Sequence, residues 1–256
     1  GISGTDKQYA NVTGNSYATI AALSKAISES PKGSSSGGSS GGSTGGGSGS
    51  SKQVGAASVS STSNVNNNQS ANNVSKPVYD DLYGYDWATE AIEYLTELKV
   101  VNGKEEGKFY PEDYITREEF TKMIVNALDI PLADEEVEFT DVAVNAWYAP
   151  YVKAAYYGGV ANGCGDNTFG IGRNITREDM AVMVYRAASK QGINLSAEQD
   201  NILFADDAAI SDYARESVYA LKYNKIISGV GNNEFSGKAF ATRAEASKMI
   251  YEVIKK

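Results

Sequence analysis

Residues 115–120 read ITREEF, and two close variants of this hexapeptide, ITREDM and ATRAEA, stand at residues 175–180 and 241–246. Each copy contains a Thr-Arg pair and an acidic residue three positions after the threonine. A threonine that caps a helix accepts a hydrogen bond from the backbone three residues on, and a carboxylate at that position reaches back to the threonine N–H. Three helix starts are therefore predicted, at Thr116 with Glu119, Thr176 with Asp179, and Thr242 with Glu245.

Other residues recur at constant intervals before each hexapeptide, so the chain carries three copies of one unit. Within a copy the intervals need no gap, and insertions fall only between copies. Apolar residues at helical spacing in each copy, including Met123, Met183 and Met249, are expected in the core. The other recurrent positions are Phe109, Phe169 and Phe235, then Gly103, Gly163 and Gly229, and then Trp87, Trp147 and Tyr213.

Each unit is predicted to form a helix, a loop and a second helix, which gives an all-α fold. In the first unit the first helix is expected to run from about Trp87 to Gly103, with Asn102-Gly103 as its C-terminal stop. The loop carries the recurrent phenylalanine, and the second helix starts at the threonine. The predicted units are residues 78–134, 135–198 and 199–256.

The chain upstream of these units has a different composition. Residues 33–51 contain only Gly, Ser and Thr. Such a composition buries too little apolar surface to offset chain entropy, so residues 31–77 are predicted to be a flexible linker. Residues 1–30 are too few for a core of their own and are expected to be the trailing part of an upstream module.

The composition also excludes several classes of function. The chain has 256 residues, no histidine, 1 cysteine (Cys164) and a formal charge of −9. Nucleic acid is not an expected partner, because a phosphate backbone needs a basic footprint. Histidine-based catalysis, histidine metal sites, an intramolecular disulfide and a multi-cysteine metal site are all excluded. No apolar stretch approaches the roughly 18 residues that span a bilayer. We expect no catalytic residue, metal or cofactor in these units.

Three of the six arginines, Arg117, Arg177 and Arg243, directly follow the capping threonines. A cation in the first turn opposes the helix dipole. Its placement there in every copy indicates either a bound anion or a carboxylate of a neighbouring unit, and spacing alone favours neither. A second recurrent set, Asp81, Asp141 and Asp206, is expected either to cap helices or to contact a ligand.

The full pattern resembles the S-layer homology motif. Its carriers are Tyr79-Asp80-Asp81-Leu82 with Trp87 and ITREE, Phe139-Thr140-Asp141-Val142 with Trp147 and ITRED, and Phe204-Ala205-Asp206-Asp207 with Tyr213 and ATRAE. The resemblance covers nearly all of residues 78–256. It implies a pseudo-threefold helical domain in which one helix of each motif joins a central bundle and grooves lie between adjacent motifs.

The resemblance also implies a function. Such domains anchor secreted proteins non-covalently to the Gram-positive cell wall by binding a secondary cell-wall polysaccharide, commonly one with an acidic pyruvate ketal. A guanidinium can grip a carboxylate with two hydrogen bonds, and an aromatic ring offers an apolar face to a sugar. The polysaccharide-binding residues would then be Arg117, Arg177, Arg243, Trp87, Trp147, Tyr213, Asp81, Asp141, Asp206, Gly103, Gly163 and Gly229.

The alternative is a structural module for protein–protein contact or self-assembly in a surface layer, in which the arginines would join units to one another. Within the carbohydrate-binding interpretation the third unit departs from the family pattern, with Tyr213 in place of tryptophan and Ala241 in place of isoleucine. The sites of Arg117 and Arg177 are therefore expected to bind better than the site of Arg243.

Overall fold

The computed structural model describes residues 78–195 and 203–256. In these ranges the backbone forms helices and isolated bridges but no strand, and the predicted all-α fold is confirmed. The linker at residues 31–77 and the upstream segment at residues 1–30 lie outside the described residues. The helices are α3 (Asp86–Glu97), α4 (Arg117–Ala127), α5 (Ala149–Tyr157), α6 (Arg177–Lys190), the short 3-10 helix η1 (Asp207–Ala209), α7 (Asp212–Tyr223) and α8 (Arg243–Ile254).

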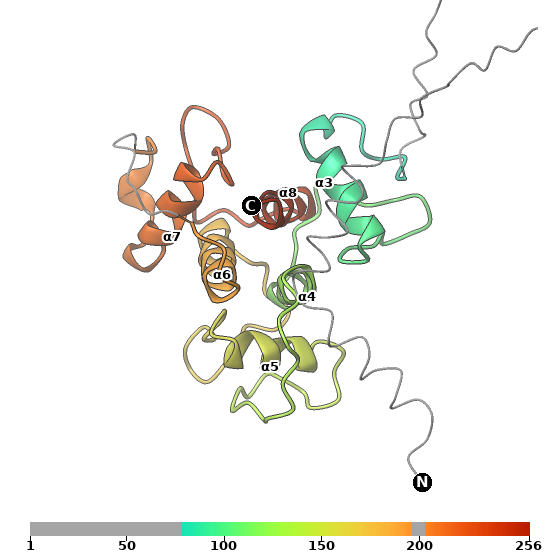
Figure 1. The fold of residues 1–256 in the computed structure, drawn as a ribbon, viewed down its shortest axis with the longest axis vertical. Coiled ribbons are helices and arrows are strands. Elements are labelled where there is room, and N and C mark those ends of the chain that lie inside the picture. Colours follow the sequence, from blue (N-terminus) through green and yellow to red (C-terminus); the bar gives the residue numbers. More distant parts are fainter. Residues whose placement is uncertain (1–77, 196–202) are drawn as a thin grey trace, which may run out of the picture. The chain divides into compact units, whose positions relative to one another are not determined.

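The second helices of the three units, α4, α6 and α8, contact one another at the centre of the fold, and the first helices surround them (Figure 1). The strongest packing crosses the unit boundaries. Helix α4 packs on α5, α6 packs on α7, and α8 returns to pack on α3. Each lobe therefore combines the second helix of one unit with the first helix of the next, and the last unit closes the ring onto the first.

A ring of backbone hydrogen bonds joins the three units just before the second helices begin. The amide of Ile115 donates to Ala241 O at 3.1 Å, Ala241 donates to Ile175 O at 2.9 Å, and Ile175 donates to Ile115 O at 3.1 Å. Each unit thus gives one bond and receives one. This cycle fixes the positions of the three Thr-Arg pairs relative to one another.

The predicted helix starts are confirmed, with one difference. Complete capping boxes form at Thr116 with Glu119 and at Thr242 with Glu245. At Thr176 the hydroxyl accepts from Asp179 N at 3.2 Å, but the structure shows no return bond from the Asp179 carboxylate. That carboxylate accepts from Tyr213 instead, and aspartate is one methylene shorter than glutamate.

The first helix ends earlier than its sequence suggested. Helix α3 stops at Glu97, and Lys99 takes a left-handed conformation with φ 59° while Val100 N returns to Leu95 O at 2.9 Å. Asn102-Gly103 is therefore not the stop. Gly103 is needed for a close approach: a Cβ there would lie 2.5 Å from Lys108 O and 2.8 Å from the Tyr79 ring.

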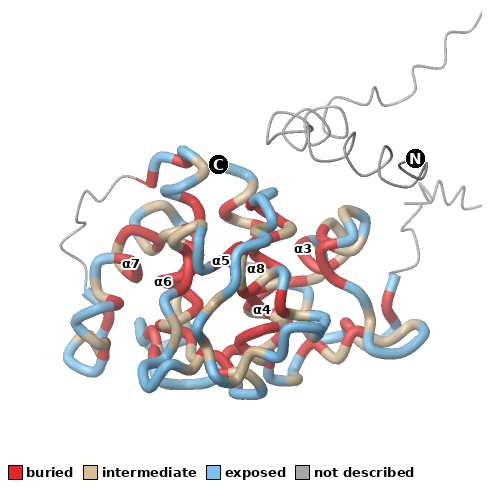
Figure 2. Tube along the Cα trace, turned by 90° about the horizontal axis from the view of Figure 1, so that it is seen from below, coloured by how far each residue is buried: buried red, intermediate tan, exposed pale blue. Residues whose placement is uncertain are grey.

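The core is continuous across the units. Phe109, Phe169 and Phe235 are fully buried, and the predicted core positions Met123, Met183 and Met249 are buried as well. Buried positions gather along the helices and exposed ones in the connecting loops (Figure 2). None of the helices in the described ranges is both long and apolar enough to cross a membrane.

Candidate functional site

We refer to Arg117, Arg177 and Arg243, which follow the capping threonines, as the slot arginines. They extend from the starts of α4, α6 and α8 into the adjacent unit. Their guanidinium carbons lie over the rings of the recurrent phenylalanines, at 5.1 Å for Arg117 over Phe169, 5.3 Å for Arg177 over Phe235 and 4.4 Å for Arg243 over Phe109. Only 6–8% of each arginine is exposed. These cation–π contacts form a second cycle around the three units, in the opposite sense to the backbone bonds, so each arginine joins two units.

Two of the arginines also donate a hydrogen bond to the loop that carries the phenylalanine under their guanidinium. Nε of Arg177 donates to Phe235 O and Nε of Arg243 donates to Phe109 O, both at 3.0 Å. Arg243 also donates from Nη2 to Asn102 O at 2.8 Å. In the described part of the chain, Nε of Arg117 is buried and has no hydrogen-bond partner.

Two of the arginines also form an ion pair with the acidic residue of the next capping position. Arg177 forms an ion pair with Glu245, and Nη1 of Arg117 lies 3.7 Å from Asp179. Burial lowers the pKa of Arg177, and the charges of Glu245 and Asp206 oppose that shift. Burial likewise lowers the pKa of Arg243, opposed first by Glu119. Arginine nevertheless stays protonated at neutral pH, so these sites remain cationic.

An open cavity lies beside Arg177. Its volume is about 470 Å³, and all three units contribute to its walls. The first unit supplies Trp87, which is 49% exposed, the second supplies Arg177, and the third supplies the rest. The side chains that can contact a ligand include Trp87, Arg177, Lys225, Val230, Glu245 and Lys248. The sequence left two alternatives for these arginines, a bound anion or a carboxylate of a neighbouring unit. Arg177 has a carboxylate partner in another unit and also an accessible space beside it.

The repeat predicts which residues surround the other two arginines. We refer to the cavity beside Arg177 as the Arg177 groove, and to the regions that the repeat assigns to Arg243 and Arg117 as the Arg243 and Arg117 grooves. The register assigns Trp147 and Lys122 to Arg243, and Nζ of Lys122 lies 5.6 Å from the Trp147 ring. The Arg177 and Arg243 grooves each have a tryptophan and two lysines at equivalent positions. The Arg117 groove has Tyr213, Gly159 and Val182 there.

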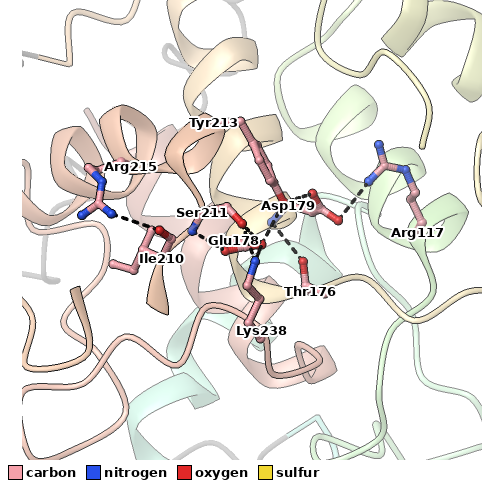
Figure 3. A network of polar contacts seen from close by, with 9 residues as sticks. All are labelled: Arg117, Thr176, Glu178, Asp179, Ile210, Ser211, Tyr213, Arg215 and Lys238. Atoms are coloured by element: carbon pink, nitrogen blue, oxygen red, sulfur yellow. Dashed lines mark hydrogen bonds and ion pairs between the residues drawn. The ribbon is translucent and has the colours of Figure 1, made fainter. Parts of the chain in front are cut away.

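Tyr213 forms a polar network where the other two grooves have a tryptophan. Its hydroxyl oxygen lies 2.9 Å from Glu178 and 2.8 Å from Asp179, so the two carboxylates share its one proton, and Asp179 faces Arg117 (Figure 3). Burial raises the pKa of Tyr213 well above its ordinary value, and the two carboxylates raise it further. Glu178 is itself buried and accepts from Lys238 Nζ at 2.7 Å. This network joins α6 to the start of α7.

The recurrent aspartates hold the phenylalanine loops. Asp81 accepts from the backbone N–H groups of Phe109 and Tyr110, and Asp206 accepts from Phe235 and Ser236. Asp141 accepts from Phe169, Gly170 and Ile171 at 2.7–2.9 Å. Each carboxylate therefore positions the loop on which a slot arginine rests. Contact of these aspartates with a ligand stays a prediction.

The recurrent glycines allow the loop to fold back closely. A Cβ at Gly163 would lie 2.6 Å from the Phe139 ring, and one at Gly229 would lie 2.4 Å from Glu234 O. Gly229 also lines the Arg177 groove. Sequence reasoning missed Lys225 and Lys248, although lysines stand at the equivalent positions Lys99 and Lys122 and could have indicated them.

The comparison with protein families agrees with this arrangement of three units. The model of the S-layer homology domain matches residues 78–121, 138–181 and 203–247. The chain belongs to the S-layer homology domain family. Family membership supports attachment to the cell wall or association with a surface layer. Within residues 78–195 and 203–256, the structure shows no cluster of three His, Cys, Asp or Glu residues that could hold a metal ion.

The relatives include enzymes and surface-layer proteins. An amylopullulanase of Thermoanaerobacterium thermosulfurigenes is 37% identical over 173 residues, which is 66% of this chain and 9% of that protein. The exoglucanase XynX of Acetivibrio thermocellus is also 37% identical over 173 residues, 66% of this chain and 16% of that protein. The S-layer protein sap of Bacillus anthracis is 27% identical over 173 residues, 67% of this chain and 20% of that protein. The S-layer homology chain thus spans a small part of each.

Proposed function

We propose that this S-layer homology chain anchors a secreted protein non-covalently to the bacterial cell wall by binding an acidic secondary cell-wall polysaccharide. The acidic group is a pyruvate ketal on a sugar. The observation that carries the proposal is the open space beside Arg177, which combines buried guanidinium, exposed indole and two lysines. On this proposal the chain is located at the cell surface and performs no catalysis itself.

The Arg177 groove has the chemistry that an acidic sugar requires. Its volume of about 470 Å³ suits a small ligand such as one or two sugar residues. Trp87 supplies an apolar face for sugar C–H groups. Lys225 stands at the helix C-terminus in a left-handed conformation with φ 59°, which brings a second cation to the groove. Lys248 brings a third, although Glu252 pairs with it at 2.7 Å.

A pull-down with purified cell wall tests the proposal. The full chain should sediment with walls that retain their polysaccharide and stay in solution with walls from which it has been extracted. The variant with Arg177→Ala and Arg243→Ala removes the guanidinium from both grooves that have a tryptophan and two lysines, and it should lose binding. Arg215→Ala removes a surface arginine that pairs with Asp207 and serves as the matched control. A double variant that keeps its helical circular dichroism and binds fully would disprove the role of the arginines.

Self-assembly is the second candidate, because the slot arginines do join units within the chain. It requires that the isolated chain associates with itself in the absence of wall material. Analytical ultracentrifugation over a wide concentration range distinguishes the two functions. A chain that stays monomeric at high concentration supports the anchor and contradicts the self-assembling module.

A further inference from the structure

Cys164 is the only cysteine of the chain, and the repeat aligns it with a residue that lines the cavity of another unit. Its equivalent in the third unit is Val230, which lines the cavity beside Arg177. Because the repeats align without gaps between the first helix and the Thr-Arg pair, the register assigns Cys164 to Arg117 as Val230 is assigned to Arg177. The residue is exposed, so its thiol is accessible to small molecules.

The Cys164 thiol donates to the carbonyl oxygen of the phenylalanine loop, which in the other two units accepts from an arginine. Its Sγ donates to Phe169 O at 3.2 Å. The equivalent carbonyls of Phe235 and Phe109 accept from arginine Nε. In the Arg117 groove the corresponding Nε is buried and unpartnered within the described residues. Loss of the thiol hydrogen would therefore free Phe169 O as an acceptor for Nε of Arg117.

The sulfur and the arginine stem flank one small space. A Cβ placed on Gly170 would lie 2.8 Å from Cys164 Sγ and 3.3 Å from Arg117 Cδ. Even a methyl group does not fit on that side. A substituent on the sulfur is therefore excluded from the Gly170 side. By the repeat register, the space left to it corresponds to the one that Val230 lines beside Arg177.

We propose that Cys164 is a reversible thiol-modification site that closes the Arg117 groove. The proposal rests on the proposed function. In exchange with a low-molecular-weight disulfide, the Cys164 thiolate attacks one sulfur, that S–S bond breaks, a new S–S bond forms and the released thiolate takes up the proton. The exchange consumes one disulfide and produces one, with no other oxidant. The Arg177 and Arg243 grooves have Val230 and Lys104 at this position and are unaffected.

The experiment uses the full chain with and without glutathione disulfide, with intact mass as the measure of modification. Calorimetry with a methyl hexoside that carries a pyruvate ketal counts the binding sites. Modification should remove one site, and dithiothreitol should restore it. Cys164→Val copies the third unit and should keep the site after treatment. Arg117→Ala should lack the site from the start, so treatment should change nothing.

Several outcomes would overturn the proposal. These are a modified chain that binds as many glycoside molecules as the untreated chain, a native thiol that reacts only after unfolding in urea, and an Arg117→Ala variant that retains every site. If the glycoside binds nowhere on the untreated chain, the proposed function fails. The Nε–H resonances in nuclear magnetic resonance then decide whether modification frees Phe169 O for Arg117. Modification should shift the Arg117 signal and leave Arg177 in place, and an unchanged Arg117 signal contradicts that change of partner.

Discussion

Nε of Arg243 donates to the carbonyl oxygen of Phe109 at 3.0 Å, and this bond joins the last unit of the domain to the first. The backbone repeats the closure, because Arg243 N donates to Asp113 O at 2.9 Å. Helix α8 packs on α3 at the same junction. The three units are therefore one cooperative ring, and removal of either terminal unit exposes the core of its neighbour.

Replacement of the closing arginine should destabilise the whole ring. Arg243→Met removes the bonds from Nε to Phe109 O and from Nη2 to Asn102 O, the contact over the Phe109 ring, and a charge that interacts with Glu119. We expect the free energy of unfolding to fall by about 3 kcal/mol, because two charge-assisted hydrogen bonds are lost and their carbonyl acceptors are left without a partner. Urea denaturation followed by circular dichroism measures the change.

The matched control for this prediction is Arg215→Met. Arg215 pairs with Asp207 near the surface, with 36% of its side chain exposed. A surface pair contributes at most about 1 kcal/mol. Equal losses for the two variants would mean that ring closure through Arg243 carries no special weight.

Alanine substitutions at two glycines distinguish the cost of a steric clash from the cost of a left-handed backbone. Gly103→Ala should cost about 3 kcal/mol, because its Cβ would lie 2.5 Å from the carbonyl oxygen of Lys108. Gly165→Ala should cost only about 1 kcal/mol, because the site is open and the cost is that of φ +91° alone. Thermal unfolding ranks the two variants. The reverse order would show that the loop moves to accept a side chain at residue 103.

The loop carboxylate Asp141 predicts a pH dependence. Burial raises its pKa, but the N–H donors of Phe169, Ile171 and Gly170 together lower the pKa by more than burial raises it. The folded-state pKa therefore lies below the ordinary value. The stabilisation is therefore present above the unfolded-state pKa of about 4 and is lost as pH falls through the folded-state pKa.

Asp141→Asn tests this sign. At neutral pH we expect a loss of about 2 kcal/mol, because charge-assisted bonds to backbone amides become neutral ones. The difference from the unsubstituted chain should shrink as pH falls from 5 towards about 2. Urea midpoints measured across that range provide the check. A difference that stays constant with pH would rule out ionisation of Asp141 as the source.

Lys225 is expected to lower the stability of the fold slightly and to strengthen binding to the cell wall. Its left-handed conformation with φ 59° costs less for glycine, so Lys225→Gly should stabilise the fold or leave it unchanged, by up to about 1 kcal/mol. The same variant should weaken wall binding, since it removes a cation from the Arg177 groove. Lys225→Gln removes the charge but keeps a polar side chain only one atom shorter, and it should weaken binding without stabilising the fold. Unimpaired wall binding by both variants would exclude Lys225 from the site.

The pattern of the sequence predicted the helix starts because a capping box is a local interaction over three residues. It was wrong about the end of α3, where Lys99 rather than Asn102-Gly103 turns the chain. Glycine suggested a stop, but Gly103 serves the approach of the loop to Lys108 and Tyr79. That requirement comes from segments that meet only after folding.

By itself the sequence determined three repeated units, their helix starts, the apolar core positions and the set of arginines at equivalent places. Only the tertiary structure decided which helices pair and what each arginine meets. The reason is that an arginine side chain in the first turn reaches beyond its own unit, so its contacts depend on how distant segments pack. The difference between the grooves, with Tyr213 and Cys164 beside Arg117 and with Trp87 and Lys225 beside Arg177, arises from that packing.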